Sequence, residues 1–141
     1  MYLLDTNIIS LFDPRRMEQE RALIAKLRAV DDRSFISVLT LAEIEAGILK
    51  LRREAKHQRA DQLAVFRDGL INNWAERLLP ITASIALAMP QIAEHALPSV
   101  VERIDLMIAA TAAIHGLTVL TRNGRHFAPT GVAWLDPADL P

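Results

Sequence analysis

Short apolar segments alternate with longer stretches of helical spacing along the whole chain, and this alternation constrains the fold most strongly. Strands that alternate with helices favour an α/β fold with a largely parallel sheet. The chain has 141 residues without an internal repeat or linker, so we expect a single domain spanning residues 1–141. The predicted strands are YLL (2–4), SFISV (34–38), LLPIT (78–82), LTVLT (117–121) and VAWL (132–135).

The spacing of apolar residues predicts the helices between these strands. Pro90 is expected to kink one of them, and the segment RNGRHF at 122–127 is expected to be a loop. In open parallel sheets, ligands bind outside the carboxyl ends of the strands. The polar clusters DTN (5–7) and TRNGRHF (121–127) both follow strands, and we therefore expect the functional site there. The predicted helices are about 8–12, 17–30, 40–55, 58–76, 83–96 and a last one ending at 116.

The segment RIDLMIAATAAIHG (103–116) carries no charge on any face between residues 106 and 114, which predicts a buried helix. Asp105 lies at its front edge, and a buried carboxylate needs a compensating charge. Arg103 points elsewhere on a helix, so a divalent cation is the stronger candidate.

The start of this helix decides between two interpretations of Asp105. Ser99 and Glu102 match a capping box, which would begin the helix at Ser99 and place Asp105 in its second turn. In that case capping does not explain Asp105. If the helix begins later, Asp105 itself can serve as the cap.

Two further acids are candidate metal ligands with ordinary alternatives. Asp5 follows a strand, and the residues around it favour a role as the cap of the next helix over that of a metal ligand. Helical geometry does not choose Glu43 over Glu45, because Glu45 lies nearer the middle of the apolar face of the predicted helix 40–55. Gly47 favours Glu43, because a glycine one turn on leaves the surface beside that carboxylate open. A solvated glutamate is the alternative at position 43.

Composition excludes several classes of function. The chain has no cysteine, so disulfides, thiolate catalysis and cysteine zinc sites are ruled out. Its 16 Lys and Arg against 17 Asp and Glu neither demand nor exclude nucleic acid. It has no run of the roughly 18 apolar residues that a membrane span needs and no basic N-terminal leader, so we expect a cytoplasmic protein. Three oxygen donors from distant segments suit Mg²⁺ or Mn²⁺.

Four blocks of the sequence together form a recognisable pattern: YLLDTNIIS (2–10), SVLTLAEIEAGI (37–48), IDLMIAATAAIHGLTVLTRN (104–123) and F…GVAWLDP (127–137). They resemble PIN-domain proteins, specifically the VapC-type toxins of toxin–antitoxin pairs. The resemblance implies a PIN-like three-layer α/β/α fold with a short, largely parallel sheet. It also implies a Mg²⁺- or Mn²⁺-dependent endoribonuclease that hydrolyses RNA, such as tRNA, with a metal-activated water. A homodimer neutralised by a cognate antitoxin, whose C-terminal segment occupies the active-site groove, is implied as well.

By this resemblance, the catalytic and metal-binding acids of the family correspond to Asp5, Glu43 and Asp105. Thr6 and Asn7 match the polar pair that follows the first aspartate and are expected to support the site.

The family commonly has a fourth acid after the fourth strand, and this chain has none there. The two corresponding positions carry Asn123 and His126. Asn123 can act as a weaker metal ligand through its side-chain carbonyl, or it can form a turn with Gly124. His126 is expected to be a loop-surface or phosphate-contacting residue rather than a ligand. We expect one well-held metal ion.

RNA binding by a nearly neutral chain requires local basic residues. The expected phosphate contacts are Arg122 and Arg125 in the strand-end loop, and Lys50 and Arg53 after the Glu43 helix, with a solvated helix face as the alternative for the latter two. The main rival function is a catalytically weakened PIN-like module that binds RNA or protein. A metal-dependent phosphatase or DNA nuclease is a third hypothesis.

Overall fold

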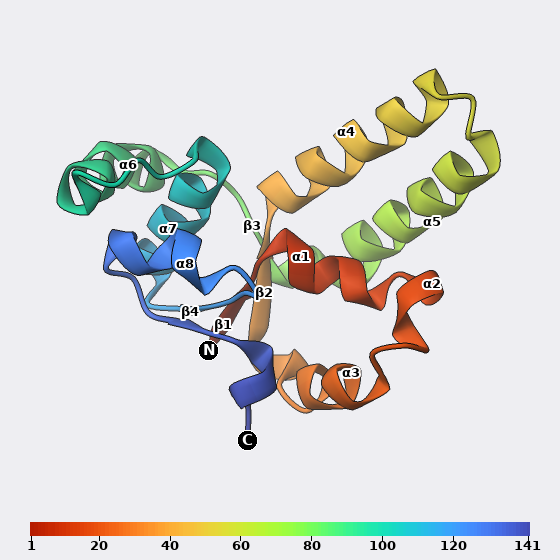
Figure 1. Cartoon of the computed structure of the whole chain (residues 1–141), viewed down its shortest axis with the longest axis horizontal. Coiled ribbons are helices and arrows are strands. Elements are labelled where there is room, and N and C mark those ends of the chain that lie inside the picture. Colours follow the sequence, from red (N-terminus) through yellow and green to blue (C-terminus); the bar gives the residue numbers. More distant parts are fainter.

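A five-stranded parallel sheet forms the centre of the computed structural model, which describes residues 1–141 (Figure 1). Neighbouring strands pair in the order β3-β2-β1-β4-β5, and every pair is parallel. The chain moves from β1 to β2 on one side and later reaches β4 on the other side of β1. The carboxyl end of β1 is therefore a topological switch point, where open α/β sheets bind ligands. The strands are β1 (Tyr2–Leu4), β2 (Ser34–Ser37), β3 (Leu78–Leu79), β4 (Thr118–Leu120) and β5 (Trp134–Leu135).

Helices cover both faces of this sheet and complete the predicted three-layer α/β/α architecture (Figure 1). Successive side chains of a strand point to opposite faces. Leu4 and Leu120 accordingly join one buried cluster, whereas Leu3 and Val119 join the other. The first cluster packs against α1 (Thr6–Ile9), α3 (Arg21–Arg28), α4 (Val38–Arg53) and α5 (His57–Asn73). The second packs against α6 (Ala83–Ala96), α7 (Arg103–His115) and α8 (Gly124–Phe127).

Helix α7 is buried in its middle because it lies between the sheet and α6. Its last turn is not covered, and Ile114 is 46% exposed there, so the prediction of burial holds only for residues 108–112. The helix ends as expected at Gly116, which adopts the left-handed conformation with φ of 65°.

The predicted capping box at the start of α7 is wrong. Glu102 is the N-cap, and its carboxylate accepts hydrogen bonds from the backbone N–H groups of Ile104 at 2.9 Å and Asp105 at 3.3 Å. This single carboxylate satisfies two first-turn donors, so the helix begins at Arg103 rather than at Ser99. Asp105 therefore lies in the first turn, but its side chain is not needed as the cap.

Other predicted elements also differ from the structure. The helix expected over residues 17–30 is shorter, since α3 covers only Arg21–Arg28 and a turn separates it from the one-turn helix α2 (Pro14–Met17). The strand expected over residues 78–82 is limited to β3. The segment expected to be a loop at 122–127 contains the one-turn helix α8, which begins directly after Asn123. No helix is both long and apolar enough to cross a membrane.

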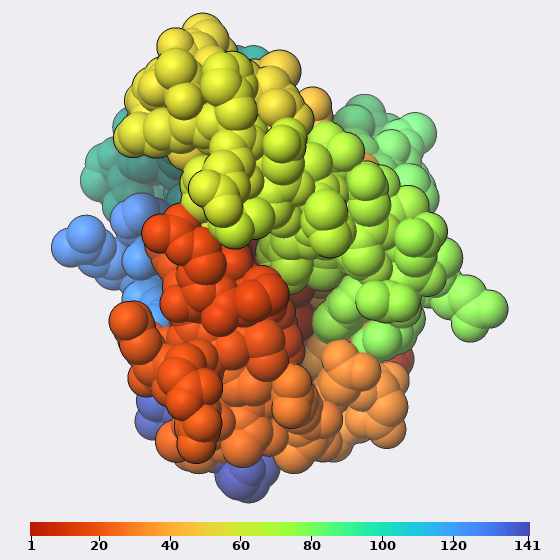
Figure 2. All heavy atoms as spheres, turned by 90° about the vertical axis from the view of Figure 1, so that its right-hand side faces the viewer, coloured from red at the N-terminus to blue at the C-terminus, as the bar shows by residue number.

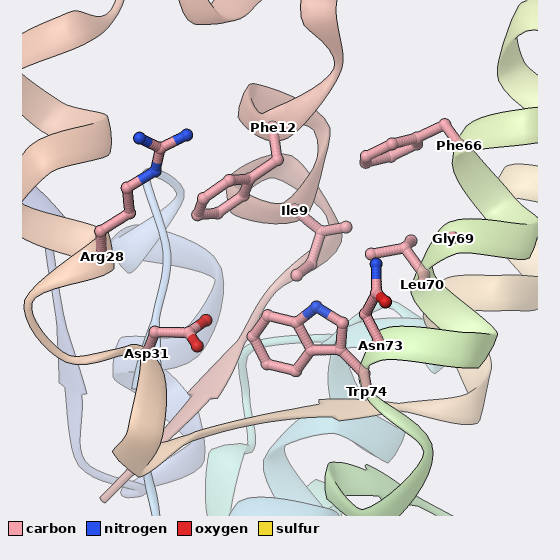
Figure 3. A pocket seen from close by; sticks show the side chains of 9 residues that line it. All are labelled: Ile9, Phe12, Arg28, Asp31, Phe66, Gly69, Leu70, Asn73 and Trp74. Carbon is pink, nitrogen blue, oxygen red and sulfur yellow. The ribbon is translucent and has the colours of Figure 1, made fainter.

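A cavity of about 370 Å³ lies between the N-terminal segment and α5, on the face drawn in Figure 2. Phe12, Phe66 and Trp74 form much of its apolar lining, with Arg28 and Asp31 at one side (Figure 3). None of the predicted site residues lines this cavity.

Candidate functional site

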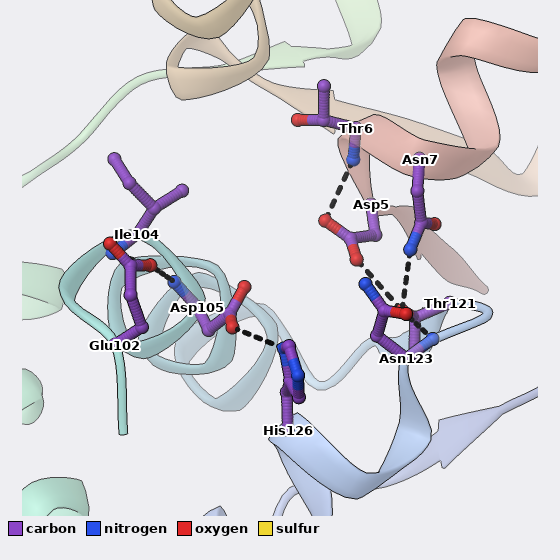
Figure 4. Close-up of polar contacts among 9 residues, drawn as sticks. All are labelled: Asp5, Thr6, Asn7, Glu102, Ile104, Asp105, Thr121, Asn123 and His126. Atoms are coloured by element: carbon purple, nitrogen blue, oxygen red, sulfur yellow. Dashed lines mark hydrogen bonds and ion pairs between the residues drawn. The ribbon is translucent and has the colours of Figure 1, made fainter. Parts of the chain in front are cut away.

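Asp5 lies at the switch point, immediately after β1. Its backbone N–H donates to the carbonyl of Leu120 at 3.0 Å, which extends the pairing with β4. Its Oδ1 accepts from the Thr6 backbone N–H at 2.8 Å, and its Oδ2 accepts from the Thr121 hydroxyl at 2.8 Å (Figure 4). Asp5 is the N-cap of α1, so it caps a helix and lies at the candidate site at the same time.

Glu43 is brought beside Asp5 because α4 follows β2, the neighbour of β1 in the sheet. Its Oε1 accepts a hydrogen bond of 2.5 Å from the Thr6 hydroxyl. That hydroxyl also lies 3.2 Å from the hydroxyl of the buried Thr40. Glu45 instead forms an ion pair with Arg67 on α5. The structure therefore places Glu43, and not Glu45, next to Asp5.

Asp105 reaches the same region from α7, on the other side of the sheet. Its Oδ2 lies 3.1 Å from Nδ1 of His126, and its side chain is 17% exposed (Figure 4). The sequence favoured a divalent cation as the partner of Asp105 and did not predict His126, which contacts it directly. His126 is placed there by the one-turn helix α8, in a segment that was predicted to be a loop.

The three acids share an electrostatic environment that disfavours their charged forms. Burial raises the pKa of Asp5 despite its hydrogen bonds to Thr121 and Thr6, and the charge of Asp105 raises it further. Burial likewise raises the pKa of Glu43, with added repulsion from Asp5 and Asp105. Burial also raises the pKa of Asp105, although the contact with His126 opposes this shift. No Lys or Arg forms an ion pair with any of the three.

The donor chemistry of this cluster fits a hard divalent cation. Carboxylate oxygens are the ligands that Mg²⁺ and Mn²⁺ prefer. The side-chain oxygen of Asn7 is buried nearby without a hydrogen-bond partner, which leaves one more acceptor unsatisfied. The side chains do not yet converge on one point, since no three of them form a ready ligand set. The assignment of Asp5, Glu43 and Asp105 as ligands of such a cation therefore stays a prediction.

The position of the missing fourth acid is occupied by Asn123. Its backbone N–H donates to the Thr121 hydroxyl at 3.0 Å, and its exposed side chain precedes α8 without capping it. Asn123 therefore begins a helix rather than an Asn-Gly turn. Its side chain has no capping role, and its backbone is anchored to Thr121, which itself contacts Asp5.

Sequence reasoning missed two threonines. The buried Thr121 hydroxyl donates to Asp5 and also contacts the Asn7 side-chain amide at 3.4 Å. Thr40 contacts Thr6 from the first turn of α4. The position of Thr121 directly after a strand was the only signal for its role, and Thr40 carried none.

The predicted RNA-binding residues are distributed unevenly around the acids. Arg125 lines a cavity of about 280 Å³ together with Asp105 and His126. Arg122 forms an ion pair with Glu20 at 3.1 Å. Lys50 and Arg53 lie on α4 but roughly 10 and 15 Å further along the helix axis than Glu43, at a rise of about 1.5 Å per residue. The structure brings Arg125 to the acids, and it does not bring Lys50 or Arg53 there.

Comparison with known proteins agrees with this geometry. Residues 2–131 match the PIN domain family. The chain is 31% identical to Toxin FitB of Neisseria gonorrhoeae, over 97% of this chain and 98% of that protein. It is 28% identical to VapC ribonuclease Y4jK of Sinorhizobium fredii, over 97% of each.

Solved structures extend the likeness to three dimensions. The crystal structure of FitAcB from Neisseria gonorrhoeae matches with a TM-score of 0.81 and 31% identity, covering 99% of this chain and 100% of that chain. Other structures of similar fold are FitAB bound to a DNA fragment and a toxin–antitoxin complex from Klebsiella pneumoniae. The chain therefore belongs to the PIN-domain family, among the VapC/FitB-type toxins of toxin–antitoxin systems.

Proposed function

We propose that the chain is a divalent-metal-dependent endoribonuclease and the toxin of its toxin–antitoxin pair. One observation carries this proposal. Asp5, Glu43 and Asp105 come from three distant segments, and no Lys or Arg forms an ion pair with them. Burial raises the pKa of each of the three, and repulsion within the cluster raises the pKa of Asp5 and Glu43 further. Structural carboxylates would be expected to have such partners. A family relative that is named a ribonuclease supports the choice of RNA as the substrate.

The roles of the residues follow from their contacts. The three acids would hold a divalent cation, which when bound would supply the positive charge for activating water and polarising a phosphodiester. Thr6 donates to Glu43 and Thr121 donates to Asp5, so each hydroxyl fixes one carboxylate. His126 orients Asp105 through Nδ1. Arg125 lies beside Asp105 and is suited to contact the RNA backbone next to the cleaved bond.

The test is cleavage of total RNA by the purified protein, free of antitoxin, with Mg²⁺ or Mn²⁺ and with EDTA. The expected products carry 5′-phosphate and 3′-hydroxyl ends. Asp105→Asn and Asp5→Ala are expected to abolish cleavage while circular dichroism shows an intact fold. Glu45→Gln is the matched control, because it removes one carboxylate from α4 away from the site. Cleavage in EDTA, or products with cyclic 2′,3′-phosphate ends, would contradict the proposal.

A second candidate function is a module that binds RNA or protein without turnover. It is favoured by the absence of a fourth carboxylate, since Asn123 and His126 occupy the positions where the family commonly has one. Each lost negative charge weakens the hold on a second metal ion. The same experiment separates the two functions: the binding module retains RNA on a filter in the presence of Mn²⁺ but leaves it intact.

Partners follow from membership in this family. We infer that a cognate antitoxin binds the chain, that the toxin forms a homodimer in the cytoplasm, and that structured RNA such as tRNA is the substrate. Co-expression with the product of the neighbouring gene, followed by size-exclusion chromatography, tests the first two inferences. Sequencing of the cleaved RNA ends identifies the substrate.

A further inference from the structure

A second cavity, of about 210 Å³, shares Thr6 and Glu43 with the acid cluster. It lies between the N-terminal segment and the α4–α5 pair. Its lining also includes two arginines, Arg16 and Arg59, and the buried Asp13. In Figure 2 the N-terminal segment, in red, lies against the beginning of α5, in yellow-green, where this cavity is formed. An anionic cluster thus adjoins a cavity with two guanidinium groups.

Arg59 has more hydrogen-bond donors than the protein satisfies. One terminal nitrogen donates to Asp13 Oδ2 at 2.8 Å, whereas the other is buried and has no partner. Buried donors without an acceptor are rare in native proteins. Arg16 is exposed, and its guanidinium contacts only the Ser10 hydroxyl, at 3.2 Å. Both guanidinium groups therefore keep donors that no protein atom accepts.

We propose that this cavity is a phosphate subsite for the RNA backbone, next to the phosphodiester that is cleaved. The proposal rests on the proposed nuclease function, because Glu43 joins the subsite to the catalytic acids. Guanidinium groups present planar donors that match phosphate oxygens. A turn of the Arg59 side chain brings its unpaired terminal nitrogen to the phosphate, and Arg16 approaches the same group from the solvent side.

The competing explanation is that the Asp13–Arg59 pair only fastens the N-terminal segment to α5. The chain offers a matched pair for this comparison. Arg67 also lies on α5, its side chain is 26% exposed like that of Arg59, and it forms an ion pair with Glu45. Arg67 does not line the cavity. A purely structural role predicts the same behaviour for both pairs.

The experiment measures binding of a short fluorescein-labelled single-stranded RNA by fluorescence anisotropy in EDTA, at several salt concentrations. Arg59→Gln and Arg16→Gln are each expected to weaken binding about tenfold. Each should also reduce the slope of log K against log salt by about 0.7, the value for one lost phosphate contact on a single strand. Arg67→Gln should leave both quantities unchanged. The repulsion from the metal-free acids is the same in all these proteins.

Asp13→Asn provides the opposite test. It removes the anion that competes for Arg59, whereas its Oδ1 can still accept from the Arg15 backbone N–H and cap α2. Binding should become tighter than in wild type, and more so than in Glu45→Gln, which makes the same charge change at the matched pair. Arg16→Gln breaks only one exposed contact, so it remains informative if Arg59→Gln does not fold.

Equal RNA affinities for Arg16→Gln, Arg59→Gln and Arg67→Gln would overturn the subsite. RNA cleavage by wild type would still support the nuclease proposal in that case. Variants that change only the affinity for the antitoxin would overturn the assignment to RNA. A wild-type protein that cleaves RNA but binds none in EDTA would overturn the subsite without affecting the nuclease proposal. Failure of the nuclease itself is recognised separately, by intact RNA in the cleavage experiment.

Discussion

Thr6 connects two of the three acids through its own backbone and side chain. Its N–H donates to Asp5 and its hydroxyl donates to Glu43, although 37 positions separate Thr6 from Glu43. Burial raises the pKa of both carboxylates, and the charge of Asp105 repels both. The hydroxyl therefore holds Glu43 near Asp5 against this repulsion, as residues outside the ligand set commonly do in metal sites.

Replacement of Thr6 by valine should weaken metal binding without removing a ligand. Loss of a residue that orients a ligand typically costs about 10- to 100-fold in metal affinity, and we expect that range for Thr6→Val in a Mn²⁺ titration by calorimetry. Thr6→Ser keeps the hydroxyl and should bind Mn²⁺ almost as wild type does. If valine and serine gave the same affinity, the hydroxyl would have no role in the site.

At the scale of elements, α8 positions both residues that stand in place of the fourth acid, because it directly follows Asn123 and contains His126. A Cβ added at Gly124 would lie 2.6 Å from Cε3 of Trp134 and closer still to other atoms of the indole. The ring of Trp134 on β5 therefore packs directly on the backbone of Gly124. This contact sets the distance between β5 and the turn that presents Asn123 and His126.

Gly124→Ala should force either Trp134 or α8 to move. Overpacking of this kind costs about 1–3 kcal/mol, measurable as a lower urea midpoint, and cleavage should fall because His126 shifts relative to Asp105. The double variant Gly124→Ala with Trp134→Ala relieves the overlap. A double-mutant cycle should therefore show coupling between the two positions, and simple additivity would contradict the proposed contact.

Helix α5 contains a different glycine with no such constraint. A Cβ at Gly69 would meet only the Asn73 side chain, at 4.0 Å, and the residue lines the apolar cavity of Figure 3 rather than the acid cluster. Gly69→Ala should stabilise the protein by about 0.5–1 kcal/mol because alanine restricts the unfolded chain and favours a helix. Thermal denaturation measures this gain, and RNA cleavage should be unchanged. A loss of stability would show that the cavity does not tolerate the methyl group.

The sequence predicts elements better than it predicts the contacts between them. Strand ends and helical spacing located β1, α4 and α7, because these signals are local. They did not choose Glu43 over Glu45, and the resemblance to the PIN-domain family was needed for that choice. The roles of Thr121 and His126 depend on partners 116 and 21 residues away, which no local pattern reveals. The predicted start of α7 was wrong, because the same local sequence fits both a capping box at Ser99 and an N-cap at Glu102.

At the scale of the whole molecule, the acid cluster lies where all three layers meet. Asp5 follows the central strand, Glu43 belongs to the helices on one face of the sheet, and Asp105 belongs to those on the other. An ion bound by all three would connect both helical layers to the sheet. Metal binding and global stability should therefore be linked.

The direction of this linkage with pH follows from the raised pKa values of Asp5, Glu43 and Asp105. An acid whose pKa is raised by folding stabilises the protein fully below its unfolded pKa of about 4. That stability is lost as the pH rises through the folded pKa. In EDTA the contribution of the cluster should therefore be smaller at about pH 7 than at about pH 5. Asp105→Asn removes one of these charges and should be more stable than wild type in EDTA at neutral pH.

A divalent cation should reverse the relative stability of wild type and Asp105→Asn. The ion requires deprotonated ligands, so the rise in melting temperature on adding Mn²⁺ should be larger at neutral pH than at about pH 5. Free Mn²⁺ at 100 times its dissociation constant adds about 2.7 kcal/mol to the free energy of unfolding of wild type. Asp105→Asn should gain much less, so that wild type becomes the more stable protein only when Mn²⁺ is present. Differential scanning fluorimetry of both proteins at the two pH values measures this crossover. Equal Mn²⁺-induced shifts in wild type and Asp105→Asn would mean that the ion does not connect the layers through Asp105.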